Sequence, residues 1–194
     1  MAQTEQKNQN VKKQFEELQS LLERAMALQT SMVLFEWDDE TLAPKGAAEH
    51  TARVIGSLSE QYQEILASMR FKELLDVCQK AEKENAGVFD EVQSAILREA
   101  AEEQERLSCI PPEEYRAYAE LTARATGIWT RAREKNDFAS FAPVLKEIIS
   151  YQKQFAAYRA KPGQKLYDVM LDTYEKGFNM EMLDPFFELM KGKI

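Results

Sequence analysis

Histidine and cysteine are scarce in this sequence of 194 residues, which contains one histidine and two cysteines, His50, Cys78 and Cys109. A catalytic zinc site takes three protein ligands, commonly two histidines and a carboxylate, and a structural site takes four cysteines or histidines. The second histidine of a His-Glu-x-x-His helix is missing, and Glu49 precedes His50 instead of following it. We therefore expect no metal site and no cofactor within this chain.

Glycine is also sparse, with seven residues scattered along the chain. That scatter excludes a dinucleotide fingerprint and a P-loop, and no Gly-x-Ser-x-Gly elbow is present. A Cys-His dyad would need a cysteine to fold back onto His50. Both cysteines lie among apolar helix residues, so we expect them to be core thiols, and we expect His50 to be a solvated surface residue.

Positive charge is in deficit, because 25 Lys and Arg against 33 Asp and Glu give a formal net charge of −8. An acidic chain repels phosphate unless its basic residues segregate, so we expect no nucleic-acid partner. No apolar stretch approaches the roughly 20 residues of a membrane span, and the polar start lacks a secretory signal, so we expect no membrane association. Without such a signal, reduced cysteines and a cytoplasmic location are expected.

Helical periodicity is what the sequence does contain. Apolar residues recur at steps of three and four from Val11 to Phe35, which predicts a long helix, and a turn is predicted from Trp37 to Gly46. Caps, prolines and periodicity predict further helices over about 47–68, 71–84, 88–107, 112–134, 138–159 (capped by Ser140) and 166–173, then a final segment to Ile194. No segment is a convincing strand. The predicted fold class is all-α, an antiparallel helical bundle forming a single domain over residues 1–194.

Two charged surfaces allow alternative interpretations. The acidic face of the helix at 88–107 could bind a cation, but without an Asp-x-Asp-x-Asp-Gly loop a solubilising role is favoured. Arg124, Arg131 and Arg133 lie near Trp129 in the sequence and could clamp a carboxylate or a phosphate. Helical spacing and nearby glutamates favour surface ion pairs instead.

Three ordered blocks of residues give the sequence a recognisable pattern. The blocks are Trp37-Asp38-x-x-Thr41-x-Ala43-Pro44-x-Gly46, then Ile110-Pro111 with Trp129-x-x-Ala132-Arg133 and Asp137-Phe138-x-x-Phe141-x-Pro143-x-Leu145, and finally Tyr167-Asp168-x-x-Leu171-Asp172-x-Tyr174-Glu175-x-Gly177. Together they resemble the carboxypeptidase Taq family, the M32 metallocarboxypeptidases. In that family the first block usually reads Trp-Asp-x-Glu-Thr-x-Met-Pro-x-Gly.

The departures from the family pattern are of two kinds. Ala43 stands where methionine is usual and Lys176 replaces the usual proline, and both changes are local. More importantly, family members are more than twice as long, and their His-Glu-x-x-His helix, third zinc ligand and substrate clamps lie beyond the position of Ile194. The chain thus resembles the N-terminal part of such an enzyme, and none of those catalytic residues can be carried over.

The resemblance implies the activity and partners of the whole enzyme. It would remove C-terminal residues from peptides with broad specificity, using zinc or another divalent metal, and it would be a homodimer. The fold would be similar to neurolysin, a helical body split by a deep groove, with the N-terminal helices forming a wall and cap of that groove. This chain would dock on the remaining C-terminal part of the enzyme and would be inactive alone.

Trp37 and Asp38 are the candidate groove residues, because the predicted turn concentrates an aromatic residue, several acids and a proline. A structural interpretation is favoured over this one: Trp37 would pack under the turn, and Asp38 or Thr41 would cap the next helix. The alternative to an enzyme fragment is a stand-alone, non-catalytic helical interaction protein.

Overall fold

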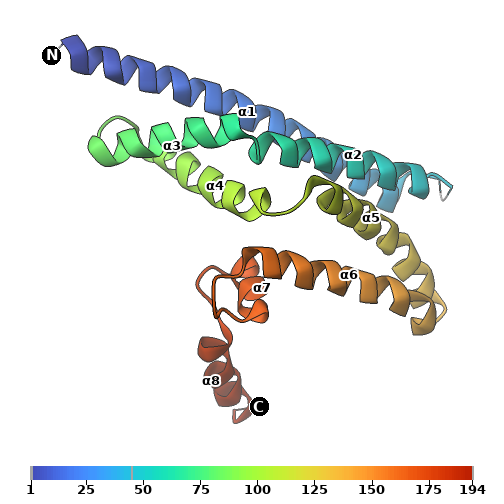
Figure 1. Cartoon of the computed structure of the whole chain (residues 1–194). Coiled ribbons are helices and arrows are strands. Elements are labelled where there is room, and N and C mark those ends of the chain that lie inside the picture. The colour runs from blue at the N-terminus through green and yellow to red at the C-terminus, as the bar shows by residue number, and fades with distance from the viewer. Residues whose placement is uncertain (1, 45, 194) are drawn as a thin grey trace. The chain divides into compact units, whose positions relative to one another are not determined.

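The computed structural model describes residues 2–44 and 46–193, with side chains from residue 6 onward, and every regular element in these ranges is an α-helix (Figure 1). The all-α fold class is therefore confirmed. Lys45 in the predicted turn and Ile194 at the predicted end of the last segment lie outside the described residues. The helices are α1 (Ala2–Thr41), α2 (Ala48–Leu66), α3 (Met69–Glu84), α4 (Glu91–Ser108), α5 (Pro112–Glu134), α6 (Phe138–Arg159), α7 (Leu166–Tyr174) and α8 (Met180–Lys191).

The end of α1 differs from the prediction, because the helix continues through Trp37 and ends at Thr41. No proline or glycine interrupts residues 36–41, and the Thr41 hydroxyl donates to the Trp37 carbonyl at 2.6 Å. The amides of Leu42 and Ala43 donate to the Asp38 carbonyl at 2.9 and 2.8 Å, and Pro44 follows. The predicted turn at Trp37 was thus wrong by about one helical turn, because Pro44 and Gly46, the residues that mark the turn, interrupt the helix only after Thr41.

One predicted helix start and one predicted helix cap also need correction. The helix expected from Val88 begins at Glu91, because Asp90 forms a capping box with Gln93, in which each side chain accepts from the other's backbone amide. At α6 the cap is Asp137, whose carboxylate accepts from the Ser140 amide at 3.2 Å. Ser140, the predicted cap, lies inside the first turn instead.

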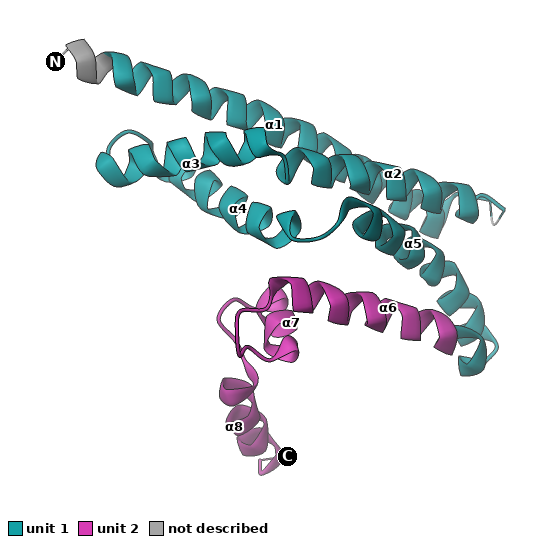
Figure 2. Cartoon of the chain, viewed as in Figure 1, with its two compact units in different colours: residues 1–141 teal, residues 142–194 magenta. Residues whose placement is uncertain are grey.

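The described residues divide into two compact units (Figure 2), residues 1–141 and residues 142–194. In unit 1, α1 packs along both α2 and α3, α5 packs on α2, and α3 pairs with α4. Unit 2 contains most of α6 together with α7 and α8. The expectation of a single domain over residues 1–194 stays a prediction.

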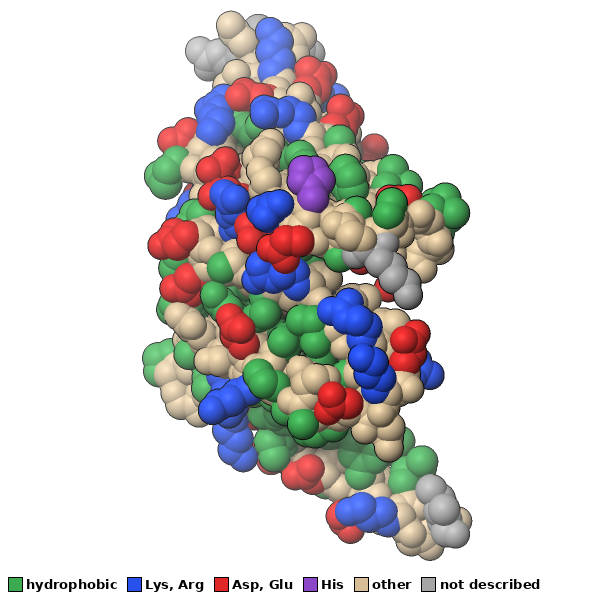
Figure 3. Space-filling model, turned by 90° about the vertical axis from the view of Figure 1, so that its right-hand side faces the viewer, with side chains coloured by type: hydrophobic (Ala, Val, Ile, Leu, Met, Phe, Trp, Pro, Cys, Tyr) green, Lys and Arg blue, Asp and Glu red, His purple; other side chains and the backbone are tan. Residues whose placement is uncertain are grey.

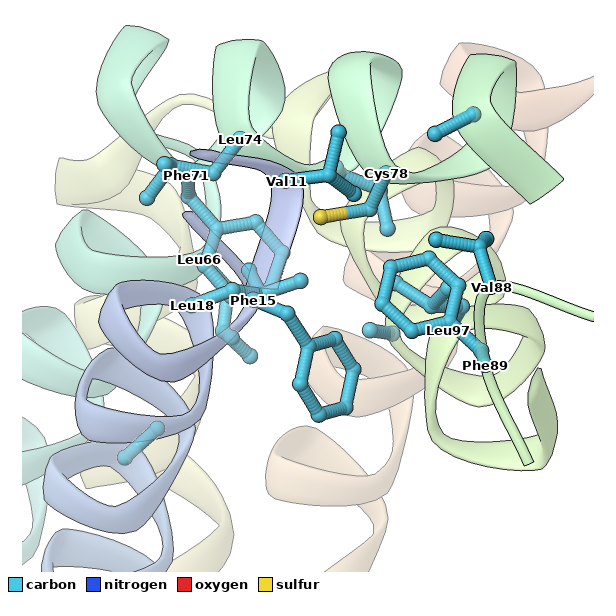
Figure 4. Packing of buried hydrophobic residues seen from close by; sticks show 14 of the residues in the cluster. Val11, Phe15, Leu18, Leu66, Phe71, Leu74, Cys78, Val88, Phe89 and Leu97 are labelled. Carbon is cyan, nitrogen blue, oxygen red and sulfur yellow. The ribbon is translucent and has the colours of Figure 1, made fainter. Parts of the chain in front are cut away.

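The main hydrophobic core lies in unit 1, where α1, α3 and α4 meet (Figure 4). Phe71 on α3 is 0% exposed, and the rings of Phe15 and Phe89 are 5.0 Å apart between centroids. Phe89 precedes the Asp90 cap, so it packs into the core from outside the helix. The fully or nearly fully buried members of this core include Val11, Phe15, Leu18, Leu66, Phe71, Leu74, Leu75, Cys78, Leu97 and Leu107.

One buried polar side chain joins three elements of unit 1. Gln63 on α2 is 0% exposed, and its Nε2 donates to the carbonyls of Leu107 at 3.1 Å and Ile110 at 2.6 Å. These carbonyls belong to the end of α4 and the connection to α5. Gln63 therefore supplies the donor for the Ile110 carbonyl and a further donor for the Leu107 carbonyl, which also accepts from the Ile110 amide at 3.1 Å.

The prediction of core thiols is confirmed for Cys78, which is buried, and was wrong for Cys109, which is half-buried outside the core; among the described residues neither cysteine forms a disulfide. Burial raises the pKa of the Cys78 thiol from its ordinary 9.0 to about 11. We expect a thiol reagent at pH 8 to modify Cys109 in the native chain and to reach Cys78 only after unfolding, because the reactive species is the thiolate. Peptide mapping by mass spectrometry measures this, and modification of Cys78 in the folded chain would contradict it.

The same pKa shift makes the free energy of unfolding depend on pH in the alkaline range. The unfolded state releases the thiol proton near pH 9, whereas the folded state retains it to about pH 11, so the free energy of unfolding decreases as the pH rises between these values. The loss is on the order of 1 kcal/mol per pH unit. Denaturant titrations over this range should show a shallower decline in the Cys78→Ala variant.

Candidate functional site

The predicted site residues lie on the last turns of α1, and both side chains face solvent. Trp37 is 58% exposed and Asp38 is exposed as well. Trp37 therefore does not pack under a turn. Neither Asp38 nor Thr41 caps the next helix, because α2 starts after Ala47, which offers no side-chain cap. The favoured structural interpretation of these residues was wrong, whereas their exposure leaves the groove interpretation open.

A cleft of about 280 Å³ lies beside this end of α1, between α1, α2 and α5. From α1 it is lined by the carboxylate residues Glu36, Asp39 and Glu40. The other two helices contribute small and hydroxyl side chains, namely Ala48, Thr51, Ala52, Ile55, Thr122, Ala123 and Thr126. These acids flank Trp37 and Asp38 in the sequence, so the predicted site and the cleft occupy the same end of the helix.

The electrostatics of this helix end are unfavourable for the isolated chain. The C-terminus of a helix carries a partial negative charge, and the last turn of α1 contains acids but no basic residue. None of Glu36, Asp38, Asp39 and Glu40 forms an ion pair with another residue in the described ranges. The cleft therefore presents hydrogen-bond acceptors and negative charge.

The sequence reasoning missed Glu36, Asp39 and Glu40 as cleft residues. The signal was available, because acids occupy four of the five positions from 36 to 40. It was missed because the helix was predicted to end at Phe35, and only a continuous helix places residues 36, 39 and 40 on one side at spacings of three and four.

The helices α2 and α5 pack closely beside the cleft. A Cβ atom added to Gly56 would lie 2.3 Å from Cγ of Glu120, so a larger residue at position 56 would have to displace the Glu120 side chain. Arg116 fixes Glu120 in place, since its guanidinium contacts Glu120 at 3.0 Å and Glu60 at 2.9 Å. These contacts raise the pKa of Arg116, mainly through its hydrogen bond to Glu120.

We expect the Gly56→Leu substitution to destabilise unit 1 by about 1–3 kcal/mol, the usual cost of overpacking, and to separate α2 from α5. Gly46→Leu is the matched control, because an added Cβ there meets no atom within 4 Å. Both tryptophans, Trp37 and Trp129, lie in unit 1, so tryptophan fluorescence during denaturant unfolding reports that unit alone. Equal midpoints for the two variants would count against tight packing at Gly56.

The other candidate residues have structural partners. His50 is exposed, and Figure 3 shows the single histidine at the surface among side chains of both charges. The neighbouring Glu49 contacts Arg124 at 3.5 Å and Arg53 at 3.8 Å, which supports the surface ion-pair interpretation of Arg124. Arg133 lies over the ring of Trp129, 5.2 Å from its centroid. Among the described residues, no three or more His, Cys, Asp or Glu are grouped so as to hold a metal ion.

Comparison with known proteins decides the family. The model of the carboxypeptidase Taq (M32) metallopeptidase family matches residues 17–194. The chain belongs to this M32 family. All three blocks of the sequence pattern, which together begin at Trp37 and end at Gly177, lie inside the matched range, so the resemblance is confirmed.

M32 relatives resemble the chain in both sequence and structure. Carboxypeptidase 1 of Bacillus subtilis is 34% identical over 174 residues, which cover 90% of this chain and 34% of that enzyme. Thermostable carboxypeptidase 1 of Pyrococcus furiosus is 30% identical over 171 residues, covering 88% of this chain and 33% of that enzyme. The BsuCP crystal structure matches with a TM-score of 0.87 at 32% identity, covering 93% of this chain and 35% of that one. The M32 chain thus spans about a third of the length of these relatives.

No helix in the described part of the M32 chain is long and apolar enough to cross a membrane.

Proposed function

We propose that this chain is the N-terminal helical region of a metallocarboxypeptidase that removes C-terminal residues from peptides with broad specificity. Membership of the M32 family carries the proposal, because the curated relatives are carboxypeptidases that match about 90% of this chain. Unit 1 would form a wall and cap of the substrate groove. Such a wall admits flexible peptide ends and excludes folded chains, and it contributes no metal ligand or nucleophile.

The residues of this chain do not fit the metal of a metallopeptidase. The sequence has a single histidine, and no suitable group of ligands is present among the described residues. Zinc or another divalent ion would therefore be held by residues in the remaining two thirds of the enzyme. It follows that the 194-residue chain is inactive alone and that its contribution is to bind and orient peptides.

Trp37 and Asp38 are the proposed peptide contacts. An exposed tryptophan offers a large apolar surface at low entropic cost, and it stands next to an acid-lined cleft of about 280 Å³. The carboxylates around the cleft would accept hydrogen bonds from peptide amides or from basic side chains. Pairing of two copies and a cytoplasmic location complete the proposal, and both are inferred from the family resemblance and the composition.

The test compares the 194-residue chain with the product of the whole coding region. Each protein is incubated with an N-blocked peptide and added divalent metal, and released amino acids are quantified by chromatography. The longer product is expected to release C-terminal residues until a chelator is added, and the short chain to release none above background. Hydrolysis by the short chain would contradict this assignment of roles, and a stop codon directly after that of Ile194 would favour the stand-alone interaction protein.

The proposed contacts are tested in the longer product. We expect Trp37→Ala and Asp38→Asn to raise KM several-fold with little change in kcat, because they remove binding that is equal in the ground and transition states. The Met69→Ala substitution, at an exposed position on α3, serves as the control. An unchanged KM in both variants would show that Trp37 and Asp38 do not contact the peptide in the groove.

A further inference from the structure

The helix α8 has an apolar face that no described residue of the chain covers. No residue of α8 is buried, and Met182, Phe186, Leu189 and Met190 are 54%, 52%, 61% and 43% exposed. Their spacings of four, three and one residues place them on one side of the helix. The acidic residues Glu181, Asp184 and Glu188 fall on the opposite side by the same periodicity, so the centre of the apolar face is free of charge.

The start of α8 is held firmly, which argues against a frayed and unstructured end. The Asn179 side chain accepts from the Met182 amide at 3.0 Å, and the Asp168 carboxylate on α7 accepts from the Met180 amide at 2.9 Å. Asp172 accepts from the amide of Gly177, whose φ of 81° suits glycine. The third sequence block, residues 167–177, thus supplies the carboxylates that fix α8 relative to α7.

A helix of this length needs a packing partner. Isolated helices shorter than about 12–15 residues are marginal in water, and most helical stability in proteins comes from packing an apolar face. Apolar residues at positions i, i+4, i+7 and i+8 form the ridge that fits the groove of another helix. The relatives are about three times as long as this chain, so the proposed enzyme contains enough further polypeptide to supply such a helix.

We propose that the face of α8 formed by Met182, Phe186, Leu189 and Met190 is the docking surface for an amphipathic helix in the part of the enzyme beyond residue 194. The proposal rests on the proposed function, which makes this chain one part of a longer carboxypeptidase. Phe186 lies at the centre of the surface and is the anchor, and the methionines on either side adapt to the shape of the docked helix.

Methionine oxidation tests the docking surface, because Met182 and Met190 report its two ends. The 194-residue chain and the product of the whole coding region are exposed to hydrogen peroxide, and sulfoxide at each methionine is quantified by mass spectrometry relative to the same residue in the denatured protein. In the longer product we expect both methionines to be oxidised at least about fivefold more slowly than in the short chain. Equal rates would overturn the proposal, as would a coding region that stops after Ile194.

A pair of variants tests the same surface independently of oxidation. Phe186→Asp puts a charge at its centre and should shift the unfolding midpoint of the longer product to lower denaturant, while the tryptophan fluorescence of the short chain stays unchanged. Asp184→Lys alters charge on the opposite side and should leave the midpoint in place. An unshifted midpoint for Phe186→Asp would overturn the proposal. So would dimerisation of the short chain that Phe186→Asp abolishes, since the face would then bind a second copy.

The two proposals can fail separately. A longer product in which Met182 and Met190 are protected but no peptide is hydrolysed would refute the enzymatic function and support the docking surface. A longer product that hydrolyses peptides while both methionines stay fully reactive would support the enzymatic function and refute the docking surface.

Discussion

Replacing Phe71 by alanine is expected to lower the free energy of unfolding of unit 1 by about 3–5 kcal/mol. Phe71 is 0% exposed and lies in the core shared by α1, α3 and α4. Removing its ring forfeits apolar burial and leaves a cavity, because neighbours such as Leu18, Leu66 and Leu74 belong to helices that cannot close in fully. Denaturant titration followed by tryptophan fluorescence measures the loss in unit 1 alone.

The matched control for this experiment is Met69→Ala on the same helix. Met69 is 72% exposed, so its truncation should change the free energy of unfolding by less than about 0.5 kcal/mol. If both variants unfolded at the same midpoint, this result would contradict the burial of Phe71 and the packing of α3 on α1.

Replacing Gln63 by leucine is expected to lower the free energy of unfolding by about 1–3 kcal/mol, although leucine is apolar and of similar size. The substitution leaves the Ile110 carbonyl without its buried donor, whereas the Leu107 carbonyl still accepts from the Ile110 amide at 3.1 Å. An unsatisfied buried acceptor costs roughly 1–3 kcal/mol, and removing the Gln63 Oε1 atom, which itself has no hydrogen-bond partner among the described residues, offsets a part of this. The connection between α4 and α5 should loosen as a result.

Hydrogen exchange measures directly how far the connection between α4 and α5 loosens. In Gln63→Leu the amides around residues 107–112 should exchange faster than in the parent chain, and the unfolding midpoint should move to lower denaturant. Gln61→Leu, at an exposed position two residues earlier, should leave both unchanged. A Gln63→Leu variant as stable as Gln61→Leu would show that the two hydrogen bonds contribute little.

Much of the local structure was predictable from neighbouring residues. The periodicity from Val11 to Phe35 predicted α1, Pro112 predicted the start of α5, and the apolar neighbours of Cys78 predicted a buried thiol. Each of these signals acts over a few residues, within one or two helical turns. The prediction was wrong at Trp37, where the turn marked by Pro44 and Gly46 was placed too early and the helix continued to Thr41.

The candidate site was only half predictable for a similar reason. Trp37 and Asp38 were proposed from the composition of the predicted turn, but their exposure was not predicted, because exposure depends on whether another helix passes over that face. The cleft beside them needs Thr122 and Thr126 of α5, which lie more than 80 positions further along the chain. No local pattern records that α2 and α5 approach closely enough for Gly56 to contact Glu120.

The sequence by itself determined the all-helical class and the M32 family, since periodicity and motif order are properties of the linear chain. The tertiary structure alone decided that Gln63 joins α2 to the α4–α5 connection, that Trp37 is exposed beside an acid-lined cleft, and that α8 has an apolar face that no described residue covers. These features depend on which distant helices meet. Which helices pack together depends on the total burial and hydrogen bonding of the folded chain. Every element contributes to that total, so no single segment encodes it.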